Sequence, residues 1–268
     1  MEWARARAAE EARLSDLASP VDPLPADAAG APIWPDVVCL ASDTPGRWTL
    51  RDAATLSRRW PLAAIVSVAT SLADGRRRSG PPLPGIEEVA WNDLPGRLAW
   101  WFSDLDAGRP GTLGLPATAR REDRVLDMAS RVRTWPDPGG LSVAARRAID
   151  AEGIAELLAA AGHTILRQSC GRPPLDEPAD VLVWDVDTLE HADLVWLRML
   201  AANRPGLAIL LLDSFPQYDT ILAATQAGAA AVLARPVSLE SLAGTLLRLK
   251  TGFRAGHHAD LGADACGS

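Results

Sequence analysis

The residue best placed to do chemistry is Asp185, a carboxylate that follows a run of apolar and β-branched residues. The segment 180–185 reads DVLVWD, a pattern typical of a buried strand. A carboxylate at the end of such a strand has two interpretations. It can be a nucleophile that accepts a phosphoryl group, which would make the protein a phosphorylation switch. It can also be only the polar residue that ends the strand.

The elements that would position Asp185 alternate regularly in the second half of the chain. Apolar runs predict strands, and apolar residues at helical spacing predict the helices between them. The predicted strands are 141–145, 163–168, 180–184, 207–212 and 230–234, and the predicted helices are 150–162, 189–203, 216–228 and 238–250. Strands that alternate with helices indicate right-handed β-α-β crossovers. We therefore expect a parallel sheet with helices on both faces.

The first half of the chain has a shorter pattern of the same kind. We expect strands within 35–46, 62–70 and 86–91, and helices within 49–60, 94–105 and 117–132. Proline- and glycine-rich stretches separate the patterned regions. The expected organisation is an N-terminal helix and Pro-rich arm (1–34), an α/β unit (35–105), a linker with one helix (106–139), a second α/β domain (140–251) and a disordered tail (252–268).

Composition excludes several classes of protein. The net charge of −7 argues against a protein that holds nucleic acid by bulk charge. The cysteines Cys39, Cys170 and Cys266 are odd in number and far apart, which supports neither a disulfide framework nor a zinc site. We expect no metal and no cofactor. The charged start of the chain lacks the apolar core of a signal peptide, and no apolar run is long enough to span a bilayer, so we expect a cytoplasmic protein without a membrane contact.

Segment 140–250 resembles the receiver domain of response regulators, the CheY-like family. The resemblance rests on AAAGH (159–163), on DVLVWD (180–185), on Gly228-Ala229 before the last strand and on Arg235-Pro236 after it. It implies a flavodoxin-like, doubly wound parallel sheet with five strands and five helices. The stretch PDVVCLASDTPG (35–46) resembles the third strand of the same family. The first unit would then be a second, incomplete receiver-like unit, placed in tandem.

The resemblance also implies a degenerate phosphoacceptor pocket. The family has two acids after the first strand, the phosphoacceptor, a hydroxyl residue after the fourth strand and a lysine after the fifth. In this chain, Asp185 keeps the phosphoacceptor position, whereas the other positions hold Ala145 and Arg146, Asp213 with Ser214 adjacent, and Arg235. Magnesium prefers carboxylate oxygens, so the loss of the two acids removes its ligands. A carboxylate at the hydroxyl position would also repel a phosphoryl group.

The same four charged residues suggest a structural role for Asp185. Arg146 and Arg235 follow the first and fifth strands, and Asp185 and Asp213 end the third and fourth. Because the carboxyl ends of these strands converge on one crevice, we expect the four side chains to form a self-neutralised cluster. A carboxylate paired in this way should have a pKa below its ordinary value.

These observations predict a pseudo-receiver protein that is not an enzyme. It would act as a phosphorylation-independent signalling or regulatory module, with the ancestry of a two-component system, and would bind protein partners. One alternative is an atypical response regulator that is phosphorylated on Asp185. Another is a DNA-associated regulator that uses the loop with Arg76, Arg77 and Arg78, which the acidic net charge disfavours.

Two further regions are candidates for partner binding. Arg76, Arg77 and Arg78 stand in a Gly- and Pro-rich loop and could bind an acidic partner through charge-assisted hydrogen bonds. The resemblance implies a second surface, built from the last strand and its flanking helices. Tyr218 and Leu247 belong to that surface, where we expect a protein contact or a weak homodimer through the last helix.

Overall fold

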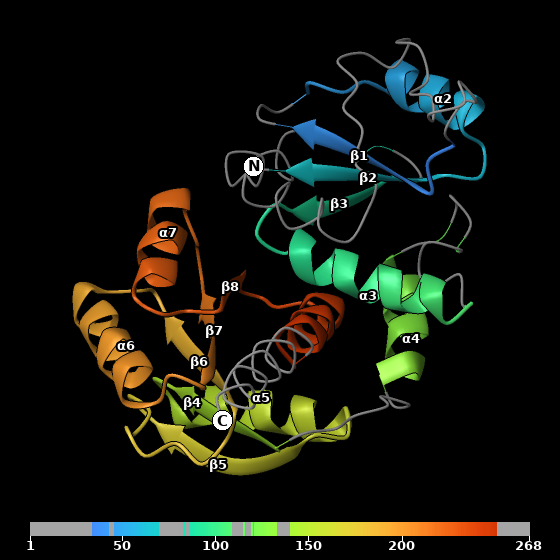
Figure 1. Ribbon diagram of the computed structural model, residues 1–268. Helices are drawn as coiled ribbons and strands as arrows, with labels where there is room; N and C mark the ends of the chain where they lie inside the picture. Colours follow the sequence, from blue (N-terminus) through green and yellow to red (C-terminus); the bar gives the residue numbers. More distant parts are fainter. Residues whose placement is uncertain are drawn as a thin grey trace, which may run out of the picture. The chain divides into compact units, whose positions relative to one another are not determined.

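The computed structural model describes residues 34–42, 46–69, 83, 86–108, 115, 119, 121–132 and 140–250. The chain divides into two compact units, residues 1–124 and residues 125–268. Each unit contains its own parallel sheet (Figure 1). The division lies inside helix α4 (Arg121–Val132), which is the helix expected within 106–139. Residues 1–33 of the expected arm and the expected tail, 252–268, lie outside the described residues.

Unit 1 contains a parallel sheet in the order β1-β2-β3. Its elements are β1 (Val37–Ser42), α2 (Leu50–Arg59), β2 (Ala64–Ala69), β3 (Glu87–Ala90) and α3 (Leu94–Asp106). Leu40, Leu56, Trp60 and Ile65 form a buried cluster that packs α2 on the sheet. This strand order equals that of the last three strands of a five-stranded 2-1-3-4-5 sheet. The identity of unit 1 as a second receiver-like unit stays a prediction.

Unit 2 contains a five-stranded parallel sheet in the order β5-β4-β6-β7-β8. The strands are β4 (Gly140–Ala145), β5 (Thr164–Cys170), β6 (Val181–Asp187), β7 (Ala208–Asp213) and β8 (Ala231–Ala234). Counted within the unit, this order is 2-1-3-4-5, which is the doubly wound flavodoxin-like order. The predicted fold class is therefore confirmed.

Helices cover both faces of this sheet. They are α5 (Ala148–Ala160), α6 (His191–Asn203), α7 (Tyr218–Gln226) and a last helix over residues 239–250. Helices α6 and α7 pack on one face, and α5 lies on the other, where its residues meet those of the last helix (Figure 1). None of the helices in the described ranges combines the length and the apolar character that crossing a bilayer requires.

The expectation of five helices in segment 140–250 is wrong, because the connection between β5 and β6 contains none. Residues 171–180 read GRPPLDEPAD, and its three prolines oppose a helix by removing backbone donors and by steric conflict. The connection is held by side chains instead. The indole nitrogen of Trp196 donates to the carbonyl of Pro173 at 2.8 Å, and the Asn203 amide donates to the carbonyl of Leu175 at 2.8 Å. Both donors belong to α6.

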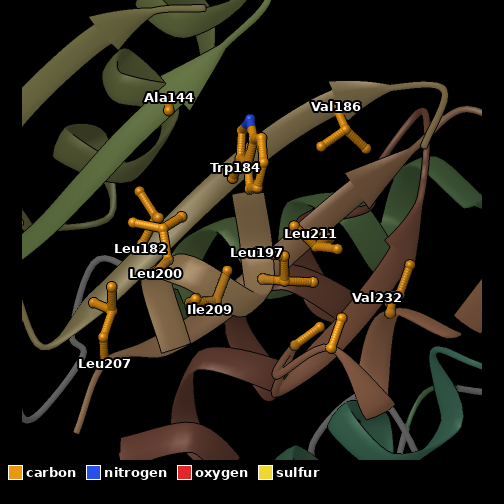
Figure 2. Packing of buried hydrophobic residues seen from close by; sticks show 13 residues of the cluster. Ala144, Leu182, Trp184, Val186, Leu197, Leu200, Leu207, Ile209, Leu211 and Val232 are labelled. Carbon is orange, nitrogen blue, oxygen red and sulfur yellow. The ribbon is translucent and has the colours of Figure 1, made fainter. Parts of the chain in front are cut away.

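A buried apolar cluster fixes the position of β6. Leu182, Trp184 and Val186 are alternate residues of this strand and lie on the face that α6 and α7 cover (Figure 2). Leu197 and Leu200 of α6 complete the same cluster. Truncation of a fully buried tryptophan costs about 3–5 kcal/mol, so this packing strongly constrains the strand. The strand in turn carries Asp185.

Candidate functional site at the carboxyl end of the sheet

Asp185 lies near the carboxyl end of β6, in register with Ala145 of β4 and Leu212 of β7. Its side chain is only 1% exposed. The register with β7 shifts before Asp187, whose φ of 59° lies in the left-handed region that aspartate adopts more readily than most residues. The backbone N–H of Asp187 donates to Oδ1 of Asp185 at 2.9 Å. The carboxylate is therefore buried at the edge of the sheet and held by its own strand.

Arg235, which follows β8, closes over Asp185. Its Nη1 donates to Oδ1 of Asp185 at 3.1 Å and lies 3.0 Å from Oδ2. The same nitrogen lies 3.4 Å from Oδ1 of Asp187, and Nη2 lies 3.6 Å from Oδ1 of Asp150. The backbone N–H of Arg235 donates to the carbonyl oxygen of Asp213 at 2.8 Å, which fixes where the side chain starts. The structure thus brings Asp185 and Arg235 together, as the sequence suggested.

The pKa of Asp185 is shifted in the direction opposite to the expected one. Burial raises the pKa of Asp185 above its ordinary value. The hydrogen bond from the backbone N–H of Asp187 and the charge of Arg235 both lower this pKa, but the carboxylates of Asp150 and Asp187 raise it. The expected depression of the Asp185 pKa is therefore wrong, because removal from water outweighs one partly exposed arginine.

Asp213 and Ser214 lie beside this pair but have other hydrogen-bond partners. Asp213 is 2% exposed, and its Oδ1 accepts the backbone N–H of Phe215 at 2.9 Å. Ser214 is exposed, and its hydroxyl donates to Oδ1 of Asp187 at 2.8 Å. Neither Arg146 nor Arg235 forms an ion pair with Asp213 in the described part of the chain. Asp213 thus holds the start of the β7–α7 loop.

Arg146 turns away from Asp185 and toward the start of α6. Its Nη1 lies 2.9 Å from Oε1 of Glu190, and its Nη2 lies 2.9 Å from Oδ2 of Asp193. Nη2 also donates to the backbone carbonyl of Thr188 at 3.0 Å. The expected cluster of two acids and two arginines therefore does not form. Arg146 and Arg235 each neutralise a different group of acids.

The residues present do not fit the magnesium ion that the receiver resemblance implies. Ala145 is fully buried and has no side-chain oxygen, and Arg146 contributes a positive charge at the second acid position. The carboxylate of Asp185 faces the guanidinium of Arg235. Magnesium needs several hard oxygen ligands, usually with one or two carboxylates. Among the described residues, no three His, Cys, Asp or Glu side chains gather so that they could hold a metal ion.

The sequence interpretation missed Arg147, Asp150 and Asp187. Arg147 donates from Nε to Oδ2 of Asp150 at 2.6 Å and from Nη2 to Oδ1 at 3.1 Å, which is a bidentate pair at i,i+3 spacing. An acid three residues after an arginine at the start of a helix indicates such an ion pair, so the sequence contained the information. Asp187 follows Asp185 by two residues, yet only the left-handed backbone turns it toward Arg235. Such a turn leaves little trace in the sequence.

The residues predicted to bind partners differ in whether the structure describes them and in how exposed they are. Arg76, Arg77 and Arg78 lie outside the described residues. Tyr218 begins α7, and its side chain is 58% exposed. Leu247 lies on the last helix and is half-buried.

Comparisons with known proteins give similarities only among solved structures. No family model and no curated protein matches the chain. The chain is similar to a putative pilus assembly protein of Burkholderia thailandensis, with 28% identity over 42% of this chain and 98% of that chain, and a TM-score of 0.39. It is similar to a putative pilus assembly-related protein of Burkholderia pseudomallei, with 26% identity over 41% of this chain and 87% of that chain, and a TM-score of 0.37.

A third similar structure is a CheY-like protein of Pseudomonas aeruginosa, with 22% identity over 42% of this chain and 99% of that chain, and a TM-score of 0.34. Each of these similarities covers less than half of the chain. The strand order of unit 2, taken alone, is the flavodoxin-like order that CheY also has.

Proposed function

We propose that the chain is a non-catalytic pseudo-receiver protein that serves as a signalling or regulatory module and binds protein partners independently of phosphorylation. The observation that carries this proposal is the Arg235–Asp185 ion pair, in which Nη1 lies 3.1 Å from one carboxylate oxygen and 3.0 Å from the other. The fold of a receiver is present, but the carboxylate at its phosphoacceptor position already has a fixed cation as partner.

The chemistry of phosphoryl transfer supports the same conclusion. For transfer, an oxygen of Asp185 must attack phosphorus while nearby cations neutralise the incoming charge. Asp185 is 1% exposed, which limits its access to a donor. Asp150 and Asp187 add negative charge around Arg235, and they would repel an arriving phosphoryl group. No side-chain oxygen is available at Ala145 to bind a magnesium ion.

The test is incubation of the full chain with MgCl₂ and acetyl phosphate, followed by mass spectrometry of the intact protein. We expect no phosphoprotein, under conditions in which a phosphorylatable receiver domain becomes fully modified as a control. A stoichiometric phosphoryl adduct that disappears in Asp185→Asn would overturn the proposal. That result would support the alternative of an atypical response regulator.

Binding of a protein partner is supported by exposed apolar side chains around α7. Phe215, Tyr218 and Leu222 are 57%, 58% and 44% exposed. Large apolar side chains that gather on a surface mark contact sites more often than isolated ones do. We propose that this surface, defined by Phe215, Tyr218 and Leu222 and named the α7 surface, contacts a protein partner or a second copy of the chain. The DNA-binding alternative rests on Arg76 to Arg78 and has no support among the described residues.

A further inference from the structure

A small cavity lies at the carboxyl ends of β4 and β6, next to the start of α6. Its volume is about 200 Å³, and it is lined by Arg146, Gly171, Arg172, Trp184, Glu190 and Asp193. Gly171 and Arg172 begin the β5–β6 connection that has no helix. Pockets for drug-sized ligands measure roughly 300–1,000 Å³, so this cavity admits a smaller molecule.

Two arginines converge on one buried acid in the cavity wall. Asp193 is 4% exposed, and its Oδ2 lies 2.9 Å from Nη2 of Arg146. Its Oδ1 lies 3.3 Å from Nε of Arg172 and 3.4 Å from Nη2. The Arg172 guanidinium also lies 6.0 Å from the centre of the Trp196 ring. Asp193 neutralises one of the two positive charges. Arg146, Arg172 and Asp193 together therefore carry a net charge of +1, before Glu190 is counted.

Glu190 supplies the balancing charge through a displaceable ion pair. Its Oε1 lies 2.9 Å from Nη1 of Arg146, and its side chain is 59% exposed while that of Arg146 is 38% exposed. Ion pairs at this exposure contribute little to stability. Glu190 is also the N-cap residue of α6, in a capping box with Asp193. A carboxylate from solution would therefore replace Glu190 at Arg146 only, and not at the start of the helix.

Trp184 adds a hydrogen-bond donor to the wall. The residue is 1% exposed, and its indole N–H donates no hydrogen bond to any residue in the described ranges. Figure 2 shows the indole nitrogen at the end of the ring that points away from Leu197 and Leu211. The indole nitrogen is not among the fully buried atoms that lack a partner, and Trp184 lines the cavity, so an acceptor atom of a ligand there can accept its hydrogen bond. Because of this donor, the cavity offers a ligand a contact that the start of α6 alone does not provide.

We propose that this cavity binds a small organic monoanion through its carboxylate group. The ligand would replace the Glu190 carboxylate at Arg146 and accept hydrogen bonds from Arg172 and Trp184 with its oxygens. It would place a compact apolar body beside the indole ring. The single negative charge matches the net +1 that Arg146, Arg172 and Asp193 leave. This site goes beyond the proposed function, because it gives the module a chemical input that does not involve Asp185.

The experiment titrates the full chain with benzoate and, separately, with its neutral analogue benzamide. Calorimetry reports the affinity, and the indole N–H resonance of Trp184, assigned with Trp184→Phe, reports the place. We expect saturable benzoate binding that shifts this resonance, and no binding of benzamide. Equal binding of both compounds, no saturable binding of benzoate, or a Trp184 resonance that stays unmoved at saturation would overturn the proposal. Tighter binding of inorganic phosphate than of benzoate would overturn the assignment of a carboxylate.

Two variants and a matched control test the residues. Arg172→Gln should raise the Kd for benzoate about tenfold, because a hydrogen bond to a charged group is worth at least that factor. Glu190→Gln should lower the Kd, because it removes the competing carboxylate. Arg167→Gln removes an arginine that pairs with Asp176 instead, at 2.9 Å, and should leave the Kd unchanged. An equal effect of Arg172→Gln and Arg167→Gln, or a Kd that Glu190→Gln leaves unchanged, would contradict the proposed site.

Discussion

Arg235 and Asp185 are joined through one guanidinium nitrogen, since Nη1 lies 3.1 Å from Oδ1 and 3.0 Å from Oδ2 of the carboxylate. The two residues are 50 positions apart in the chain and come from strands that are not neighbours in the sheet. The pair therefore links the third strand of the unit to its fifth.

Loss of the arginine should destabilise unit 2. Arg235→Gln leaves the Asp185 carboxylate buried without its cation, and breaking a fully buried pair costs roughly 3–5 kcal/mol. Because the Arg235 side chain is 25% exposed, we expect a smaller loss in the free energy of unfolding, about 2–3 kcal/mol. Urea denaturation at neutral pH measures it. Arg198→Gln, at an exposed arginine of α6, is the control and should change stability by less than about 1 kcal/mol. Equal losses in both variants would contradict a special role for the Arg235–Asp185 pair.

The buried carboxylate of Glu177 should make stability depend on pH. Glu177 is 1% exposed, and burial raises its pKa above the ordinary value of 4.5, against the opposing effects of the Ser142 hydroxyl and the charge of Arg167. The raised pKa means that the folded state binds the proton more tightly than the unfolded state does. This contribution to stability is complete below pH 4.5 and is lost as the pH rises through the folded-state pKa.

Comparison of the parent protein with Glu177→Gln checks this dependence. The glutamine cannot ionise, so the variant should gain stability relative to the parent as the pH rises from about 4 to about 8. Urea denaturation at a series of pH values measures the difference. A difference that stays constant, or that shrinks with rising pH, would contradict a raised pKa of Glu177 in the folded state.

Glu87 should be important for the stability of unit 1. This residue of β3 pairs with Arg97 through Oε1, and its Oε2 lies 3.2 Å from Nη1 of Arg124. Burial, with the nearby charge of Arg124, lowers the pKa of Arg97 below its ordinary value. Glu87→Gln removes the shared counter-charge, so we expect a loss of roughly 3 kcal/mol.

Denaturation followed by tryptophan fluorescence checks the Glu87 prediction, because the Arg97 guanidinium lies 5.3 Å from the centre of the Trp101 ring. Glu122→Gln serves as the control, since Glu122 is an exposed acid in the first turn of α4. The control should change stability by less than about 0.5 kcal/mol. Similar unfolding curves for the parent and Glu87→Gln would exclude the proposed role of this carboxylate.

The α7 surface should control association. Leu222→Glu places a charge on a side chain that is 44% exposed, so the fold should tolerate it while any contact through this surface weakens. Sedimentation velocity over a range of protein concentrations measures self-association. Leu247→Glu tests the last helix in the same way, and Leu166→Glu, at a side chain 50% exposed on β5, is the control. If Leu222→Glu and Leu166→Glu sediment like the parent, the α7 surface is not a contact between copies.

The sequence predicted the positions of the central strands β4, β6 and β7 well because they are buried on both faces. The run DVLVWD placed a strand at 180–184, and β6 extends from Val181 to Asp187. Both faces of such a strand are apolar, so its pattern is unmistakable. The missing helix between β5 and β6 was also readable, since GRPPLDEPAD has the wrong composition for one. The fifth helix is implied only by the family resemblance, since the residue pattern predicts no helix between 168 and 180.

The partners of the long charged side chains were harder to predict. Arg235 was correctly expected at Asp185, because it directly follows β8 at that edge of the sheet. Arg146 follows β4, which lies next to the strand of Asp185, yet its guanidinium pairs with Glu190 and Asp193. An arginine has several rotatable bonds and reaches acids in more than one direction, so strand order alone does not decide among them. The pKa of Asp185 depends on that same choice.

The β5–β6 connection without a helix has a consequence for how unit 2 opens. Strand β5 is at the edge of the sheet, and its residues alternate between exposed and half-buried, whereas β6 is buried from Val181 to Val186. Local opening requires little free energy where few apolar contacts are lost. Amide hydrogens of β5 should therefore exchange with solvent long before those of β4, β6 and β7. Local unfolding of unit 2 would begin at β5. The amides of β4 and β6, the strands that carry Ala145 and Asp185, would stay protected from exchange until the whole unit unfolds.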